Sequence, residues 1–272
     1  KSIFNHDINA KFSKNLFGKR LGDLINFNLD SKNDSNINYS LALDILRKHP
    51  GFYFEVFDSA YNEVGWSNDL KLLNIKNLFI KINSNSFGSL SLDYRLTDNL
   101  TYFELINNNT VNDEGDVNLI PKVSQHTNTI KYLKFKWQKE FRFGKFALDN
   151  SFIYQSVSQN QNILNLPDFI TRNTFYYSNN VFNKAMFFQT GLSFKYFSKY
   201  YASEYNPLIS SFHVQSEKKI GGFPMIDFFV NAKIKQTRLY LKAEHINSSV
   251  TGNSFYSSPS YPYRDFLIRF GL

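Results

Sequence analysis

The chain has 272 residues, of which 31 are Lys or Arg and 23 are Asp or Glu, so its formal net charge is +8. The absence of Cys excludes a disulfide framework, a zinc ribbon, an iron–sulfur cluster and a cysteine nucleophile. Aromatic residues make up 18% of the chain, which is too many for a disordered protein. No run approaches the roughly 18 apolar residues of a transmembrane helix. Lys1 is not an initiator and no signal peptide is visible, so we expect a mature or trimmed chain.

Apolar and polar residues alternate through most of the chain, and this period of two indicates β-strands. Each window is about ten residues long, which suits a tilted strand that crosses a bilayer better than a soluble strand of about 5–6 residues. No helix of any length is expected. In chain order, the expected strands lie near 21–30, 36–45, 51–58, 73–83, 87–96, 100–107, 128–139, 143–156, 170–178, 184–197, 209–217, 225–235, 238–247 and 263–272.

Two all-β architectures share this alternation, a soluble sandwich and a membrane barrel. Several aromatic residues lie toward one end of their apolar stripes, as in the aromatic belts at a lipid interface. These residues are Tyr39, Tyr94, Trp137, Tyr154 and Tyr196. An open sheet would leave unpaired edge groups in lipid. We therefore predict an all-β fold, a closed antiparallel transmembrane β-barrel of about fourteen strands, as a single domain over residues 1–272.

The links between the expected strands differ in length. Short links such as Thr97–Asn99 and Gln236–Thr237 are expected on one side of the membrane. Longer links such as Asn108–Thr127, Ser156–Asp168 and Asn247–Pro262 are expected on the other side. Outer-membrane barrels sort their links in this way.

Ordered landmarks run through the last third of the sequence. They include Tyr154-Gln155-Ser156, Leu164-Asn165-Leu166-Pro167, Gln189-Thr190-Gly191-Leu192, Phe212-His213-Val214-Gln215, Phe223-Pro224-Met225-Ile226-Asp227-Phe228 and Lys242-Ala243-Glu244-His245. This order resembles the β-barrel porin family of Bacteroidota outer membranes from about Phe143 to Leu272, and more loosely upstream. The family's usual Tyr-Pro is Phe223-Pro224 here. The resemblance implies a barrel in the cell outer membrane and does not imply a substrate, because one fold hosts many functions.

No pattern in the sequence supports a metal site, a bound cofactor or a catalytic site. The five His residues are scattered without the spacing of metal ligands. Ser203, Ser210 and Ser211 lie near His213, but nothing in their spacing distinguishes them from ordinary loop and strand residues. Basic residues are spread along nearly every segment, which argues against a nucleic-acid partner. The chain is therefore not expected to be an enzyme.

The residues expected to line a lumen are more informative. They are Lys134, Lys136, Lys145, Asp149, Gln155, Gln189, Lys195, Asp227, Lys233, Lys235, Arg238, Lys242, Glu244 and Arg269, with Asp44 and Asp93 as further inward acids. A pore with this lining would carry a positive potential and favour anions. The alternative is a filled interior in which these charges pair across strands. Lys233 and Lys235, for example, would then face Lys242 and Glu244 across the Gln236–Thr237 turn.

The leading functional hypothesis is a passive, porin-like outer-membrane channel for polar solutes or ions with a net-basic lumen. The alternative is a non-conducting barrel subunit of a larger outer-membrane complex for protein insertion, secretion or nutrient uptake. Outer-membrane lipids are expected partners, and other outer-membrane barrels or lipoproteins are candidate partners. The sequence leaves the solute and the oligomeric state open.

Overall fold

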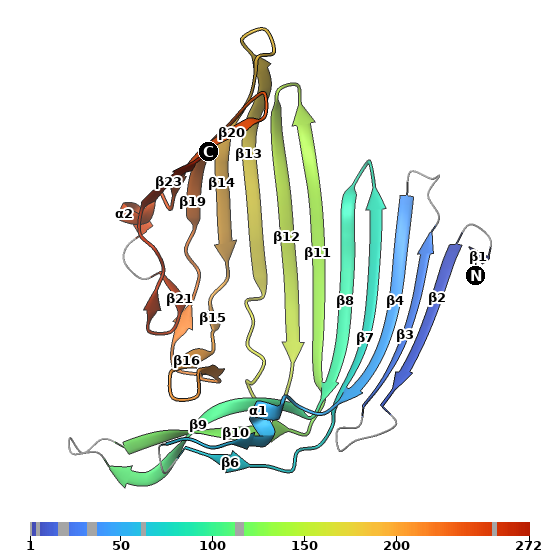
Figure 1. The fold of residues 1–272 in the computed structure, drawn as a ribbon, viewed down its shortest axis with the longest axis vertical. Coiled ribbons are helices and arrows are strands. Elements are labelled where there is room, and N and C mark those ends of the chain that lie inside the picture. The colour runs from blue at the N-terminus through green and yellow to red at the C-terminus, as the bar shows by residue number, and fades with distance from the viewer. Residues whose placement is uncertain are drawn as a thin grey trace.

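The computed structural model describes residues 2–3, 6–15, 22–31, 37–60, 64–111, 117–251 and 255–272. One antiparallel sheet of thirteen strands dominates the structure, and its strands follow one another in chain order (Figure 1). They are β1 (Ser2–Ile3), β2 (His6–Lys14), β3 (Gly22–Ser31), β4 (Ile37–Lys48), β7 (Leu73–Ser84), β8 (Gly88–Asp98), β11 (Ile130–Phe143), β12 (Phe146–Ser158), β13 (Phe169–Val181), β14 (Met186–Phe197), β19 (Met225–Ile234), β20 (Thr237–Glu244) and β23 (Leu267–Gly271).

The remaining strands form two-stranded sheets outside the main sheet, and apart from β9 and β10 they are only two or three residues long. The strands are β5 (Val56–Phe57), β6 (Trp66–Ser67), β9 (Leu100–Val111), β10 (Val117–His126), β15 (Tyr200–Tyr201), β16 (Glu204–Asn206), β17 (Ser211–His213), β18 (Lys219–Ile220), β21 (Tyr256–Ser258) and β22 (Tyr261–Pro262). Two four-residue helices, α1 (Phe52–Glu55) and α2 (Ser248–Thr251), complete the described elements.

The links at the two ends of the main sheet differ sharply in length. Residues 85–87, 144–145, 182–185 and 235–236 form tight turns at the upper end in Figure 1. Residues 49–72, 99–129, 159–168, 198–224 and 245–266 connect strands at the lower end. We call these the short-turn end and the long-link end. The expectation for Thr97–Asn99 was wrong, because this stretch leads from β8 into the β9–β10 hairpin at the long-link end.

Three of the expected strands lie outside the main sheet. Residues 51–58 contain helix α1, because a short run of apolar residues such as Phe52, Tyr53 and Phe54 has no period that separates a strand from a helix. The window 100–107 belongs to the β9–β10 hairpin, and only Ser211–His213 of the window 209–217 is a strand. Conversely, β2 and β10 were not expected.

Few apolar side chains are buried, and none forms a central core under the sheet. One buried cluster consists of Val64, Phe103, Val123 and Ile209, and a second of Phe223, Met225 and Phe255. Large apolar side chains such as Phe135, Phe175 and Leu192 lie exposed along the strands instead. A soluble domain of this size would bury such residues, whereas a membrane barrel turns them toward lipid.

The sheet is curved, and its two edges lie on opposite sides of the view in Figure 1. Strands β1 and β23 form the edges, and no pairing joins them within the described residues. The all-β, antiparallel character expected from the alternation is therefore confirmed. The closure of this sheet into a barrel stays a prediction.

Candidate functional site: the polar face of the sheet

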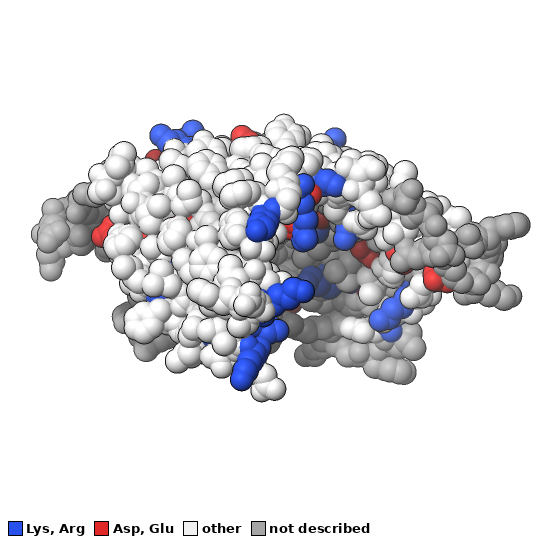
Figure 2. All heavy atoms as spheres, turned by 90° about the horizontal axis from the view of Figure 1, so that it is seen from above, with Lys and Arg blue, Asp and Glu red and all other residues white. Residues whose placement is uncertain are grey.

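The two faces of the main sheet have opposite character because paired residues of neighbouring strands point to the same side. One such row contains Asp93 on β8, Lys134 on β11 and Gln155 on β12. We call the face with this row the polar face and the opposite face the apolar face. Seen from the short-turn end, several Lys and Arg side chains surround a hollow within the curve of the sheet (Figure 2).

The strand register shows where the residues expected to line a lumen lie. Twelve of the fourteen share the polar face: Lys134, Lys136, Asp149, Gln155, Gln189, Lys195, Asp227, Lys233, Arg238, Lys242, Glu244 and Arg269. The other two, Lys145 and Lys235, belong to tight turns at the short-turn end and not to strands. Asp44 and Asp93 also share the polar face.

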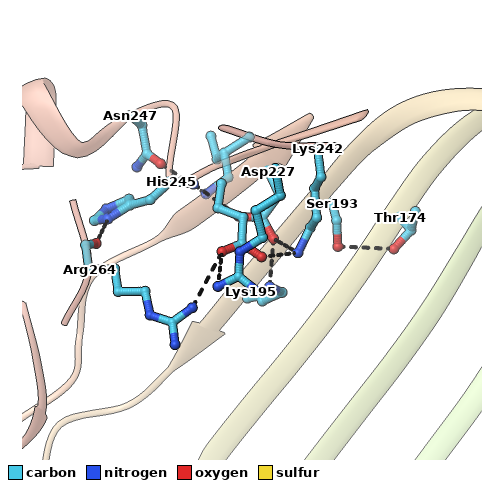
Figure 3. A network of polar contacts seen from close by, with 11 residues as sticks. Thr174, Ser193, Lys195, Asp227, Lys242, His245, Asn247 and Arg264 are labelled. Atoms are coloured by element: carbon cyan, nitrogen blue, oxygen red, sulfur yellow. Dashed lines mark hydrogen bonds and ion pairs between the residues drawn. The ribbon is translucent and has the colours of Figure 1, made fainter. Parts of the chain in front are cut away.

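Asp227 is the centre of an ion-pair network on this face (Figure 3). Asp227 is 3% exposed, and its carboxylate accepts a hydrogen bond from Lys195 Nζ at 2.6 Å. Lys242 Nζ lies 3.2 Å from the same oxygen, and the backbone N–H of His245 donates to the other oxygen at 3.0 Å. Burial of a carboxylate is costly unless it is paired and hydrogen-bonded, and Asp227 meets both conditions. Three strands and the link after β20 converge at this residue.

The network continues along β20 to the last strand of the sheet. Lys242 also donates to Glu244 Oε1 at 2.7 Å. The other carboxylate oxygen of Glu244 lies 3.2 Å from an Arg269 nitrogen and 3.9 Å from an Arg264 nitrogen. The ion pairs thus connect β14, β19, β20 and β23 on one side of the sheet. Both acids of this network, Asp227 and Glu244, are thus in contact with cations.

A second, smaller cluster lies on β8 and β11, between the middle of these strands and the long-link end. Asp93 lies 3.5 Å from Lys134 and 3.8 Å from Arg95. Nearby, Gln155 accepts a hydrogen bond from the Tyr132 hydroxyl at 3.0 Å and donates to the Pro167 carbonyl at 2.7 Å. Gln155 therefore fixes the end of the link 159–168, just before β13 begins.

Other cations on the polar face have no carboxylate within 4.0 Å in the described part of the chain. They include Lys136, Arg172, Lys233 and Arg238. Lys233 and Arg238 are directly opposite one another, and like charges in such a pair destabilise a sheet. The alternative of a filled interior placed Lys233 and Lys235 opposite Lys242 and Glu244, but in the structure Lys233 faces Arg238. The turn is Lys235–Gln236, one residue earlier than expected, and it places Lys242 opposite Phe229.

From β11 to β23 the polar face carries nine Lys or Arg and four Asp or Glu, an excess of five positive charges. The apolar face of the same strands carries only Lys131 and Lys139. Arg172 was missed at the sequence level. The alternation of Ile170, Arg172 and Thr174 with Thr171, Asn173 and Phe175 is weak, because both sets contain polar residues.

An aromatic cluster lies at the long-link end, where Figure 1 shows α1, β6, β9 and β10. Tyr53, Phe54 and Trp66 pack against the buried core of Phe103, Val64, Val123 and Ile209. The Tyr53 hydroxyl donates to the Ile209 carbonyl, and the Val214 N–H donates to the Phe103 carbonyl at 2.8 Å. These contacts join three long links, 49–72, 99–129 and 198–224. We call this assembly the rim cluster.

Beside the rim cluster lies a cavity of about 740 Å³, lined by Glu104, Glu204, His213 and Glu217 among others. His213 is 4% exposed, and its Nε2 lies 4.0 Å from Glu204. Burial lowers the pKa of His213 below its ordinary value near 6.5, and Glu204 partly opposes this shift. Within the described residues no three His, Asp or Glu side chains could hold a metal ion. No described helix has the length and apolar character to cross a membrane.

A family model described as "Putative porin" matches residues 2–272. The chain belongs to this porin family. The family places the porin in the outer membrane, which the chain crosses with several strands. This match confirms the porin family that the sequence resemblance indicated.

One solved structure that resembles the porin is the siderophore receptor PirA from Acinetobacter baumannii, with a TM-score of 0.60 and 12% sequence identity. The match covers 99% of this chain and 43% of the receptor. The porin thus spans less than half the length of that receptor, and the likeness concerns the fold alone. No curated protein matches the chain.

Proposed function

We propose that the porin forms the wall of a passive outer-membrane channel whose lumen is lined by the polar face and favours anions. The observation that carries this proposal is the excess of positive charge on the polar face. The acids of the two ion-pair clusters are held by neighbouring cations, so Lys136, Arg172, Lys233 and Arg238 keep their full charge toward the hollow. Rings of Lys and Arg select anions in pores.

Closure of the sheet is part of the proposal. Unpaired N–H and C=O groups at a sheet edge are costly in lipid, since no water is present to bond them. The apolar face then contacts lipid, and the polar face encloses water. Bacterial barrels have short periplasmic turns and longer extracellular loops. The long-link end, with the rim cluster, is accordingly proposed to face the cell exterior.

The test is ion selectivity in planar bilayers. We expect a double variant, Lys233→Glu with Arg238→Glu, to move the reversal potential in a salt gradient toward that of a cation-selective pore. The control is Lys131→Glu, which changes a lysine on the apolar face and should leave selectivity unchanged. Equal selectivity of the double variant and the unaltered porin would contradict the proposal.

The rim cluster favours a second candidate function, a non-conducting subunit of a larger outer-membrane complex. Its aromatic core joins three links across one end of the sheet and would narrow or occlude a lumen there. Gentle detergent extraction followed by sizing distinguishes the two functions. A stable complex with other proteins and no conductance would support the subunit function. A lone barrel or a homo-oligomer that conducts would support the channel.

A further inference from the structure

The apolar face carries a row of basic residues near the long-link end. Lys14, Arg47, Lys76 and Lys131 lie on β2, β4, β7 and β11, and each lies within four residues of that end of its strand. The register places all four on the apolar face: Lys14 is opposite Asp23, which is opposite Arg47, and Leu96 is opposite both Lys76 and Lys131. We call these four residues the outer basic row.

The outer basic row marks the boundary of the apolar wall. In each strand, the next residue on the same face toward the short-turn end is apolar, namely Phe12, Ile45, Leu78 and Leu133. Phe12 is 68% exposed and Ile45 is 43% exposed, as expected for side chains that contact lipid tails. The row is thus where lipid tails would end and lipid headgroups begin.

The charge of the row is largely uncompensated. Arg47 pairs with Asp23 at 2.8 Å. Lys14, Lys76 and Lys131 are exposed and have no carboxylate within 4.0 Å among the residues that the structure describes. Asp98, which belongs to the same end of the same face, accepts a hydrogen bond from the Thr129 hydroxyl at 2.5 Å. Lys14 on β2 and Lys131 on β11 are the first and last of six adjacent strands. Five inter-strand spacings therefore lie between them, and the row extends over roughly 24 Å.

We propose that the outer basic row binds the phosphate groups of lipid headgroups. A lysine whose stem lies along an apolar wall can extend its ammonium to the headgroup level. Clusters of Lys and Arg at that level attract anionic lipids. A free phosphate is the less suitable ligand, because the row is a shallow line beside lipid and not an enclosed pocket. The inference requires only that the apolar face contacts lipid, and it does not depend on whether the lumen conducts.

The chain offers a matched control on the same two strands. Lys76 and Lys131 lie on the apolar face of β7 and β11, and Lys81 and Lys136 lie on the polar face of the same strands. None of the four has an ion pair within the described ranges. We compare the outer double variant, Lys76→Gln with Lys131→Gln, with the inner double variant, Lys81→Gln with Lys136→Gln.

The readout is native mass spectrometry of the full chain in detergent, titrated with phosphatidylglycerol or with phosphatidylcholine of the same acyl chains. We expect the unaltered porin to retain phosphatidylglycerol preferentially. Each lysine near an anionic headgroup contributes about fivefold in affinity, so the outer double variant should lose more than tenfold. The inner double variant should bind phosphatidylglycerol as the unaltered porin does. Heat-modifiable migration on gels verifies that both variants fold.

Equal phosphatidylglycerol binding by the outer double variant and the unaltered porin would overturn the inference, as would an equal loss in the inner double variant. Displacement of the lipid by millimolar inorganic phosphate would indicate a free-phosphate site and would also overturn it. Ion selectivity of the same two variants keeps the channel proposal separate. The inner variant should reduce anion preference and the outer variant should not, whatever lipid binding shows.

Discussion

Asp227 provides the sharpest test of the structure. The substitution Asp227→Asn preserves the size of the side chain and an oxygen that can accept the His245 N–H, but it removes the negative charge that faces Lys195 and Lys242. Hydrogen bonds to charged groups contribute about 1.5–3 kcal/mol each. Lys242 retains Glu244 at 2.7 Å, so most of the loss falls on Lys195.

We therefore expect Asp227→Asn to lower the free energy of unfolding by about 2–3 kcal/mol, somewhat less than the loss usual for breaking a fully buried ion pair. The control is Asp149→Asn, on the same face, since Asp149 is exposed and has no ion pair in the described part of the chain. Its effect should stay within about 0.5 kcal/mol.

The assay is urea unfolding of the porin in lipid vesicles, followed by tryptophan fluorescence. A double-mutant cycle with Lys195→Met isolates the pair, because residues in contact show a coupling energy and independent residues do not. Equal stabilities of the Asp227→Asn and Asp149→Asn variants, or a coupling energy near zero, would refute the assignment of Asp227 as the centre of the network.

Two further predictions concern the packing of β14 and the rim of the sheet. A Cβ at Gly191 would lie 2.3 Å from the Phe175 carbonyl oxygen, so Gly191→Ala should destabilise the sheet by about 1–3 kcal/mol in the same urea assay. Gly51→Ala should not, because its Cβ would meet only Phe54 Cδ2, at an ordinary contact distance of 3.7 Å. Because unfolded His213 takes up a proton more readily than folded His213, the region around it should be fully stable above about pH 6.5 and lose stability as the pH falls below that value. Hydrogen exchange over residues 204–217 at pH 7.5 and pH 5 measures this loss, and a loss of equal size in His213→Gln would contradict it.

The alternation of side chains was sufficient to predict most strands of the main sheet. It succeeds for β11 and β14, where one face is mostly apolar and a period of two is clear over about ten residues. It failed for β10, whose apolar residues Leu119, Ile120 and Val123 keep no period and are interrupted by Pro121. It failed for α1 because four residues are too few to show a period.

The membership of the polar face was predictable, but its pairing was not. A face follows from position along one strand, so twelve of the fourteen expected residues share it. An ion pair such as Lys195 with Asp227 depends on the register between two strands joined by the long link 198–224, and no local pattern specifies that register. The error at Lys235 shows how a one-residue shift of a turn changes every partner beyond it.

The separation of short turns and long links to opposite ends of the sheet determines where the chain can accept insertions. A residue inserted into the turns 144–145 or 235–236 would exchange the polar and apolar faces of the following strand, because side chains alternate with a period of two. A residue inserted into 159–168 adds length beyond the end of a strand and leaves the register untouched. Related chains should therefore differ in length at the long-link end and keep constant turns at the other. Peptide tags and foreign loops should likewise be tolerated at the long-link end.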